Sequence, residues 1–537
     1  MIGNSVYGGG FGQTGVLVEG SNNVLVGDDD VTTTTWTSVF MGCFPFVGCI
    51  SFPVPTTSTD YNGNNVSNLE TGIAVLGGSN NTIRNNDVTS IGENGIEVFD
   101  TVNGVFIEDN YVNGTGNFGI YAEAFENAEI TGNRVRYTTS DGLAADGYND
   151  EGTGFSVLVE GNDVENAGGE GIFVAYTDDV DVIDNEIDDV AYGGVVVEQS
   201  GNVTVSENDI DDAGYEGIYV GFSANALIDN NVVDDTENGI VVEKVHGKNF
   251  GSGVVSGGFA TVSNNYVTDS SVDGISVLRS KGAVVSNNEV YGTGRDGISV
   301  KRSDEVAVLA NDITEAGRDG VFVKLSDDIL IQQNTIFGGN GGLFTTGATG
   351  AGRDGIHVVE SNGVRIDDNS VKGGNGGFFA EGGIGAERDG IFVKDSDDVV
   401  ISNNDVVSGD GSIFGAGGDA AGRHGIFVKD GSGSYVPTIF SAVVSSVRDG
   451  IKVLNNKVKG VGQDGIRIEG DAYSYYGDGS RTVVRENIVS DAGRDGIYVN
   501  GLSNVRIVKN IVANVGQDGI DLSNSSGSRV AKNIVVL

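Results

Sequence analysis

Two consecutive stretches decide the fold of this chain: residues 171–193 read GIFVAYTDDVDVIDNEIDDVAYG, and residues 194–216 read GVVVEQSGNVTVSENDIDDAGYE. Each is 23 residues long and carries Asn-x-Ile at the same place, at Asn185 and Asn208, after an alternating triplet, VDV or VTV. Apolar and polar residues that alternate with period two predict short β-strands, which bury Val and Ile and expose the residue between them. Three such strands with tight turns fill one stretch, which leaves no room for a helix.

The same pattern returns along almost the whole chain, mostly in steps of 22 to 24 residues. Repeats of this length indicate a solenoid, in which each coil packs only on its neighbours. The Gly-Ile-x-Val signal, or a close variant, begins at Gly72, Gly95, Gly119, Gly171, Gly194, Gly217, Gly239, Gly274, Gly297, Gly320, Gly355, Gly390, Gly425, Gly496 and Gly519. The Asn-x-Val or Asn-x-Ile signal begins at Asn86, Asn110, Asn133, Asn162, Asn185, Asn208, Asn231, Asn265, Asn288, Asn311, Asn334, Asn369, Asn404, Asn487, Asn510 and Asn533.

Identical positions at a fixed period are expected to stack as columns about 4.8 Å apart. Val then lies on Val and Ile on Ile, and the side-chain amide of each column Asn can bond the same amide of the next coil. We expect this Asn to take the left-handed backbone of a tight turn, and Gly to let the chain bend sharply into the strand. One coil cannot bury its own core, so residues 1–537 are predicted to form a single all-β solenoid.

These Gly-Ile-x-Val and Asn-x-Ile coils resemble the repeat of the right-handed parallel β-helix proteins, which include pectate lyases, polygalacturonases, mannuronan C5-epimerases, phage tailspikes and copper-site maturation proteins. The resemblance covers essentially the whole chain and implies a single-stranded parallel β-helix of three sheets, with about 23 residues per coil. It implies less about chemistry, because different functions share this scaffold. The catalytic stretch of the epimerases and lyases, Tyr-Gly followed closely by an Asp-Pro-His-Glu cluster, has no counterpart here. The Asp sets of the polygalacturonases are not identifiable either.

The chain is strongly acidic, and its charge is uneven. It has 76 Asp and Glu against 31 Lys and Arg, a net charge of −45; residues 1–240 hold 40 acids and 3 bases, and the remaining residues hold 36 and 28. A surface of this sign repels nucleic acid, anionic membranes and polyuronate that carries no bound cations. No apolar run approaches the roughly 18 residues of a membrane helix. We therefore expect no nucleic-acid partner and no membrane insertion.

Several acidic turns are candidates for bound ions, although no motif requires a cofactor. Clusters of carboxylates with little neighbouring positive charge suit Ca²⁺, but none here has the spacing of an EF-hand or of the calcium-binding nonapeptide repeat. The alternative is a solvated acidic surface. The candidate calcium ligands are Asp28, Asp29, Asp30, Asp178 and Asp179.

Four residues are candidates for catalysis on an acidic sugar. Removal of a C5 proton needs a base, an opposing acid and cations that neutralise the substrate carboxylate. His357 follows Gly-Ile and is expected to point outward, and His424 takes the place of Asp in a column of Asp residues. Arg388 and Lys394 would supply the cations, because they belong with Arg353, Arg423 and Lys429 to a basic strip on adjacent coils.

The alternative for the arginines is structural. Stacked Asp side chains repel one another, and an Arg column beside them relieves this repulsion. Arg-Asp-Gly is found at Arg353 and Arg388, with Arg-His-Gly at Arg423, and the Arg-Asp-Gly triplet also occurs at Arg295, Arg318 and Arg494. Recurrence over so many coils favours the ladder, since an active site is usually singular.

Two departures from the repeat predict accessory structure. Gly-rich insertions at 338–352, 373–387 and 409–422 each carry an apolar pair, and we expect them to fold down as a side flap beside an exposed column of aromatic residues. The flap either covers these residues or leaves an apolar face for a partner or a sugar. That column is Phe322, His357, Phe392 and Phe427. Residues 32–60 are apolar and Pro-rich, which favours either a lid or a docking arm for a neighbouring molecule. Cys43 and Cys49 lie in this segment, where a disulfide is possible but not demanded.

The first and last coils motivate the functional prediction. The sequence opens and closes in the same Asn-turn, without a polar segment that would cap the β-ladder. Two explanations are open: the sequence is a piece of a longer chain, or subunits stack head to tail and continue the β-ladder. The predicted function is a structural extracellular or surface protein that assembles with itself, head to tail, into a fibre. The alternative is a polysaccharide-active β-helix enzyme, of uronate lyase or C5-epimerase type, or a sugar-binding relative. The residues expected at the assembly contact are Ile2, Val6, Trp36, Phe44, Phe46, Val536 and Leu537.

Overall fold

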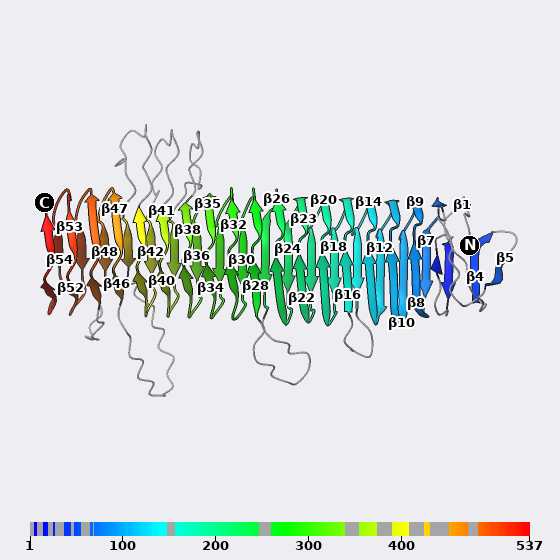
Figure 1. Ribbon diagram of the computed structural model, residues 1–537, viewed down its shortest axis with the longest axis horizontal. Helices are drawn as coiled ribbons and strands as arrows, with labels where there is room; N and C mark the ends of the chain where they lie inside the picture. The colour runs from blue at the N-terminus through cyan, green and yellow to red at the C-terminus, as the bar shows by residue number, and fades with distance from the viewer. Residues whose placement is uncertain are drawn as a thin grey trace, which may run out of the picture. The chain divides into compact units, whose positions relative to one another are not determined.

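The fold is seen in a computed structural model of the chain (Figure 1). It describes residues 69–147, 156–245, 259–338, 354–372, 389–407, 424–429, 451–470 and 482–537, together with the strands among residues 5–67. Side chains before Val66, of residues 101–103 and of Gly338 are not part of this description. The chain divides into a first unit, Met1–Tyr266, and a second unit, Val267–Leu537, each of which is taken by itself below.

Each unit is built from three parallel sheets, named here after the sequence signal that their strands carry. In the first unit, the Gly-Ile sheet holds β2 (Thr14–Glu19), β7 (Thr71–Leu76), β10 (Ile96–Glu108), β12 (Ile120–Phe125), β15 (Leu143–Asp146), β18 (Ile172–Ala175), β21 (Val195–Glu198), β24 (Glu216–Gly221) and β27 (Asn238–Glu243). The triplet sheet holds β3 (Leu25–Val26), β8 (Ser79–Arg84), the end of β10, β13 (Asn127–Thr131), β16 (Ser156–Glu160), β19 (Asp179–Ile183), β22 (Asn202–Ser206), β25 (Asn225–Asp229) and β28 (Ala260–Ser263). The Asn sheet holds β1 (Ser5–Tyr7), β6 (Asn65–Ser67), β9 (Asp87–Ile91), β11 (Tyr111–Thr115), β14 (Arg134–Thr138), β17 (Asp163–Ala167), β20 (Glu186–Val190), β23 (Asp209–Ala213) and β26 (Val232–Asp234).

The second unit repeats this plan. Its Gly-Ile sheet holds β30 (Ile275–Leu278), β33 (Ile298–Lys301), β36 (Val321–Lys324), β39 (Ile356–Val359), β42 (Ile391–Lys394), β45 (Ile426–Lys429), β48 (Ile466–Glu469), β51 (Ile497–Asn500) and β54 (Ile520–Ser523). Its triplet sheet holds β31 (Val284–Ser286), β34 (Ala307–Leu309), β37 (Leu330–Gln332), β40 (Arg365–Asp367), β43 (Val400–Ser402), β46 (Lys452–Leu454), β49 (Val483–Arg485), β52 (Arg506–Val508) and β55 (Arg529–Ala531). Its Asn sheet holds β32 (Glu289–Tyr291), β35 (Asp312–Ala316), β38 (Thr335–Gly338), β41 (Ser370–Lys372), β44 (Asp405–Val407), β47 (Lys457–Val461), β50 (Ile488–Ala492), β53 (Ile511–Ala513) and β56 (Ile534–Val536), and β29 (Tyr266–Thr268) crosses the boundary between the units.

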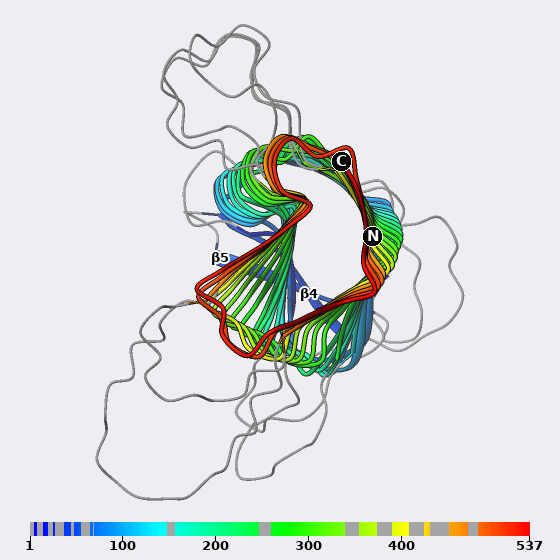
Figure 2. The ribbon, with the colours of Figure 1, turned by 90° about the vertical axis from the view of Figure 1, so that its left-hand side faces the viewer.

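Strands of successive coils pair in parallel with the columns in register, so the predicted right-handed parallel β-helix of three sheets is confirmed. Viewed end-on, the coils of the second unit lie one behind another (Figure 2). No helix occurs among the described residues, and none of them forms a segment that could cross a membrane as a helix. The alternation works as predicted: in β39 the side chains of Ile356 and Val358 are fully buried in the core, and His357 between them lies on the outer face.

The asparagine column forms a buried ladder, as the sequence predicts. Nδ2 of Asn185 donates to Oδ1 of Asn208 at 2.9 Å, and Nδ2 of Asn208 donates to Oδ1 of Asn231 at 2.9 Å. The expected left-handed backbone was assigned to the wrong residue, because it belongs to the residue before the ladder Asn, such as Asp184 with φ 55° and Glu207 with φ 59°. The turn is made there so that the amide of the next residue can face the neighbouring coils.

The role of the column glycine also differs from the expectation of a sharp bend. Gly171 has no positive φ, but a Cβ on it would lie 2.6 Å from Ile187 Cγ2 and 2.7 Å from the carbonyl oxygen of Gly194. Glycine is therefore required for close packing between coils. The repeat also includes three residues that the sequence reading passed over, Gly142, Gly465 and Asn456.

Several predicted features lie outside the described residues. They include most of the three Gly-rich insertions and the side chains of residues 32–60, with Cys43 and Cys49. In that last segment only the strands β4 (Thr37–Phe44) and β5 (Gly48–Val54) are described, which pair antiparallel, and β4 also pairs antiparallel with β2. The flap and the lid or docking arm stay predictions.

Candidate functional site

A column of buried acids runs beside the Gly-Ile sheet of the second unit, one residue before each column glycine. We call it the acid column; it consists of Asp273, Asp296, Asp319, Asp354, Asp389, His424, Asp464 and Asp495. Each side chain accepts a hydrogen bond from the backbone N–H at the same position of the next coil, for example from Asp354 N to Asp319 Oδ1 at 3.1 Å and from Asp389 N to Asp354 Oδ1 at 2.8 Å. These bonds fix Oδ1 and leave Oδ2 of each carboxylate for other partners.

His424 is a member of this column, as its sequence position predicts. Its backbone N–H donates to Asp389 Oδ1 at 2.7 Å, and its ring Nδ1 accepts the N–H of Asp464 at 3.2 Å. Nδ1 therefore accepts the backbone hydrogen bond that a carboxylate oxygen accepts in the other coils. This bond requires Nδ1 without a proton, which places the ring proton of a neutral His424 on Nε2.

Cations reach the acid column from the outer face. Arg318 binds Asp296 through Nε and Nη2, and its Nε lies 3.3 Å from Asp319 Oδ2. Lys301 Nζ lies 3.1 Å from Asp273 Oδ2. Burial is the main cause that raises the pKa of Asp296 to about 7; the neighbouring carboxylates of Asp319 and Asp273 raise it further, against the opposing effect of Arg318. Arg295 and Arg318 thus lie against the acid column. Arg353, Arg388 and Arg423 lie outside the described residues, so the ladder at their coils stays a prediction.

A groove of about 730 Å³ lies on the outer face of this sheet. Its floor is the middle residue of successive strands, Phe322, His357, Phe392, Phe427 and Arg467. The rim at the strand starts holds Arg318, Asp354, His424, Gln463 and Arg494. The rim at the strand ends holds Lys324, Val359, Lys394, Lys429 and Glu469. Within the strand-end column, Lys324, Lys394 and Lys429 therefore bring positive charge to an otherwise acidic chain.

The aromatic floor of the groove is largely buried. Phe322 is only 9% exposed and Phe427 only 4%. The rings pack on one another at the spacing of the strands, with centroids 5.3 Å apart between Phe322 and His357 and 5.0 Å apart between His357 and Phe392. Arg318 also covers the ring of Phe322, 4.6 Å from its centroid. The floor is therefore mainly aromatic, and the rims carry most of the charged side chains.

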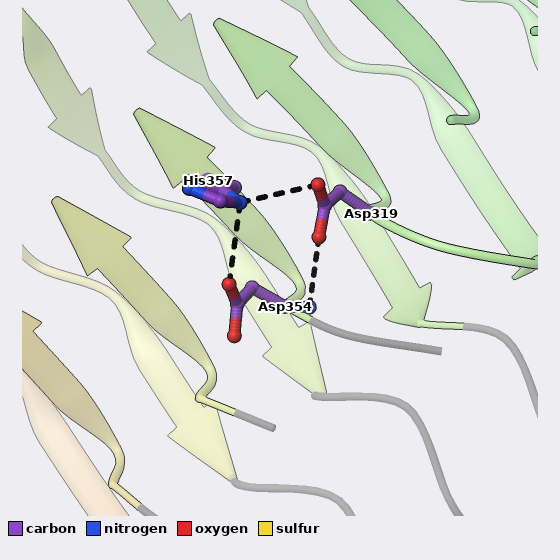
Figure 3. Close-up of side chains that lie close together, drawn as sticks. All are labelled: Asp319, Asp354 and His357. Atoms are coloured by element: carbon purple, nitrogen blue, oxygen red, sulfur yellow. Dashed lines mark hydrogen bonds and ion pairs between the residues drawn. The ribbon is translucent and has the colours of Figure 1, made fainter. Parts of the chain in front are cut away.

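His357 faces two members of the acid column (Figure 3). Its Nδ1 lies 3.2 Å from Asp319 Oδ2 and 3.4 Å from Asp354 Oδ2. Both carboxylates come from turns before the Gly-Ile strands, while His357 projects from β39, and all three side chains are almost fully buried. Among the described residues, this is the one group of three acidic, His or Cys side chains whose ligand atoms could share a metal ion.

The structure brings together three of the four predicted catalytic candidates. His357, His424 and Lys394 line the groove, and Arg388 lies outside the described residues. Of the calcium candidates, Asp28, Asp29 and Asp30 lie outside the described residues; Asp179 Oδ1 accepts a hydrogen bond from Asn202, and neither Asp178 nor Asp179 belongs to a three-residue ligand group. Calcium binding stays a prediction.

Sequence reasoning did not single out several residues of the groove. Lys324 occupies the same column as Lys394 and Lys429, and Arg467 occupies the column of His357. A column alignment of the strand-end residues would have found Lys324. Asp319, the second acidic partner of His357, could not have been found in this way, because the contact crosses from one coil to the next.

Comparison with known proteins concerns the fold. The family model for the right handed beta helix region matches residues 1–151, 51–177, 118–258 and 250–535. No curated protein sequence matches the chain. Among solved structures, the periplasmic alginate epimerase AlgG is 12% identical with a TM-score of 0.35, covering 81% of this chain and 78% of that one. The catalytic unit of a GH87 alpha-1,3-glucanase from Streptomyces thermodiastaticus is 12% identical with a TM-score of 0.32, covering 71% and 64%. The Dettilon tailspike protein is 12% identical with a TM-score of 0.31, covering 78% and 62%. Sequence identities and TM-scores this low do not assign an activity to this chain.

Proposed function

We propose that the groove of the second unit binds an anionic polysaccharide. The premise is that this chain belongs to the right-handed β-helix family, whose model matches nearly all of it. The scaffold repeats equivalent side chains at the spacing of the strands, about 4.8 Å. A sugar polymer laid across the strands meets one coil after another, so a column of equal charges can contact several of its units. An extracellular or cell-surface location belongs to the same proposal, because such polymers occur there.

The lysine rim is the observation that carries this proposal. The side chains of Lys324 and Lys394 are 45% and 43% exposed, and Lys429 is exposed as well. Their local acidic partners are distant for ion pairs, with 3.9 Å from Lys324 Nζ to Glu360 and 3.6 Å from Lys394 Nζ to Asp395. In a chain of net charge −45, three accessible cations in one column mark the place where an anion is attracted rather than repelled.

The floor of the groove also suits a sugar ligand. Carbohydrate rings present C–H groups and hydroxyls, which suit a mixed surface of aromatic and polar side chains. The guanidinium of Arg467, held by Asp464 and Glu469, is rigidly placed beside Phe427. Three of its N–H groups donate to these two carboxylates, and its remaining N–H groups can donate to a carboxylate or sulfate of the ligand.

Binding is tested by affinity electrophoresis in gels that contain polygalacturonate, alginate or a neutral glucan. We expect the acidic polymers alone to retard the protein, and added salt to weaken this effect. Changing Lys324, Lys394 and Lys429 together to Gln should weaken binding by at least about tenfold, if each charge contributes roughly 0.5 kcal/mol. The matched control changes three lysines that are ion-paired elsewhere in the second unit, Lys281, Lys457 and Lys509, to Gln. Equal losses in both triple variants, or equal binding of the neutral glucan, would contradict the proposal.

Catalysis in the groove is the further step that the sequence suggests. A lyase would produce unsaturated uronate, which absorbs in the ultraviolet, and an epimerase would change the ratio of C5 isomers without cleavage. His357 and Lys394 both line the groove, so both belong to this hypothesis. His424 is a weaker candidate as a base, because its Nδ1 is already engaged with the backbone of Asp464.

Self-association into a fibre is a separate proposal that rests on the repeat. Ile2, Val6, Trp36, Phe44 and Phe46 have no described side chains, and the remaining two predicted contact residues are exposed in or after β56. These two are Val536 and Leu537. Strand edges with exposed apolar residues favour pairing with a further strand.

A further inference from the structure

We propose that Asp319, Asp354 and His357 bind one divalent transition-metal ion, such as Zn²⁺ or Mn²⁺, at the floor of the groove. The site does not depend on the nature of the polysaccharide. It is built from the acid column and from one imidazole that faces this column.

Backbone hydrogen bonds of the acid column orient the carboxylates of Asp319 and Asp354. Oδ1 of Asp319 accepts the N–H of Asp354, and Oδ1 of Asp354 accepts the N–H of Asp389. In both residues Oδ2 remains on the side of His357, as the dashed lines of Figure 3 show. Hydrogen bonds that hold the non-ligating atoms of a metal ligand orient it and raise its affinity for the ion. Backbone N–H groups of the neighbouring coils thus hold both carboxylates in a fixed orientation, as a metal site requires.

The distances fit a small ion. Metal–oxygen and metal–nitrogen bonds of about 2.0–2.1 Å at tetrahedral angles place neighbouring donor atoms about 3.3 Å apart. His357 Nδ1 lies 3.2 Å from Asp319 Oδ2 and 3.4 Å from Asp354 Oδ2, and all three ligand atoms lie within 4.8 Å of one another. His357 and Asp354 line the groove, so water or an anionic group of a ligand can complete the coordination.

The competing explanation is a protonated His357 that acts only as a cation. Arg467 plays that part at the equivalent position of another coil, where its Nη1 lies 2.7 Å from Asp464 Oδ2. Arg318 Nε is also within 3.3 Å of Asp319 Oδ2, but a carboxylate oxygen has a second lone pair for an ion. Histidine differs from arginine in that its neutral form is a metal ligand.

The ligand set also indicates the class of ion. Two carboxylates with one imidazole suit Zn²⁺, Mn²⁺ or Fe²⁺, whereas Ca²⁺ and Mg²⁺ prefer oxygen ligands alone. Two further carboxylates of the buried column, Asp296 and Asp389, flank these two ligands. A divalent ion relieves the repulsion among these carboxylates.

The test measures metal content and metal affinity of the full chain. After metal loading and gel filtration, we expect one more tightly bound Zn²⁺ per wild-type chain than per His357→Phe chain. Phe is the matched replacement, because Phe322 and Phe392 occupy the same column in the neighbouring coils. His357→Arg copies Arg467, keeps the cation and should likewise lose the ion. Glu305→Gln, which removes an exposed acid elsewhere, should keep it.

Two readouts separate a built site from diffuse attraction of cations to an acidic surface. Bound Cu²⁺ should show magnetic coupling to one imidazole nitrogen in the wild-type protein and none in either His357 variant. Isothermal titration should show Ca²⁺ binding that is unaffected by both variants. Equal zinc content in the wild type and in a folded His357→Phe or His357→Arg variant would overturn the proposal, as would the absence of nitrogen coupling.

Discussion

Replacing Arg318 with Ala tests whether the acid column depends on cations that reach it from the groove. Arg318 Nε lies 2.7 Å from Asp296 Oδ1, and its Nη2 contacts Oδ2 of the same carboxylate. Asp296 is fully buried, while the Arg318 side chain is 26% exposed. Removing one partner of a buried ion pair costs about 3–5 kcal/mol. Because solvent screens part of this pair, we expect Arg318→Ala to lower the free energy of unfolding by about 2–3 kcal/mol at pH 8.

The loss should depend on pH in a defined direction. The pKa of Asp296 is raised from its ordinary value of 3.8 to about 7, mainly by burial, so this group stabilises the fold fully below pH 3.8 and less as the pH rises through 7. Arg318 stabilises the ionised form and opposes this loss. Without Arg318 the pKa of Asp296 rises further, and the difference between variant and wild type should grow from pH 5 to pH 8.

Urea unfolding followed by circular dichroism at both pH values measures this difference. Arg295→Ala is the control, because Arg295 Nε lies 3.8 Å from Asp273, its side chain is 43% exposed, and Lys301 also neutralises that carboxylate. We expect this control to lose no more than about 1 kcal/mol. The reasoning would be refuted if Arg318→Ala cost the same at pH 5 and pH 8, or no more than Arg295→Ala.

Three further predictions concern the ladder, a second buried acid and assembly. Asn208→Ala removes five hydrogen bonds of a buried side-chain amide, including the acceptor of the Asn185 N–H. We expect it to lower the free energy of unfolding by about 3–5 kcal/mol in urea. The control, Asn202→Ala at an exposed amide, should cost less than about 1 kcal/mol in the same experiment. Burial, and after it Glu170, raise the pKa of Asp141 to about 8, so ionisation of this carboxyl above pH 8 destabilises the fold. Asp141→Asn should therefore unfold at a higher urea concentration than the wild type above pH 8. An unchanged urea midpoint at pH 9 would contradict this. Negative-stain microscopy should show filaments or axial dimers that disappear when a charged polar cap is fused after Leu537, and a monodisperse monomer at high concentration would count against assembly.

The fold could be predicted from the sequence because each coil repeats the same physical constraints. Alternating Val and Ile fix which face of a strand is buried, and a buried Asn is tolerated only where its amide finds partners on neighbouring coils. Asn456 was passed over because insertions place it 52 residues after Asn404 and 31 before Asn487, so the regular step fails there. The chemical rule still holds at Asn456, whose amide donates to Asn487 Oδ1 at 3.0 Å.

The candidate site could be predicted only in part. The sequence places His357 on an outer face and His424 in the acid column, and both positions are confirmed. It does not show that Asp319, 38 residues before His357, supplies a hydrogen-bond partner at 3.2 Å. It also does not show that the rings of the aromatic column bury one another. Both facts depend on the contact between coils, which a linear pattern gives only once the register is known.

The repeat explains how a chain of net charge −45 can carry a cationic groove. In the first unit, the strand-end column that corresponds to the lysine rim contains Glu123, Asp146 and Glu198, which are acidic. In the second unit, the equivalent position on β42 and β45 is Lys394 and Lys429. A change of residue in one column alters a surface along the sheet without disturbing the core, because the neighbouring positions of each strand remain Ile and Val. The scaffold therefore separates folding from surface charge: the apolar and Asn columns hold the coils together, and the outer columns of the Gly-Ile sheet vary between the coils.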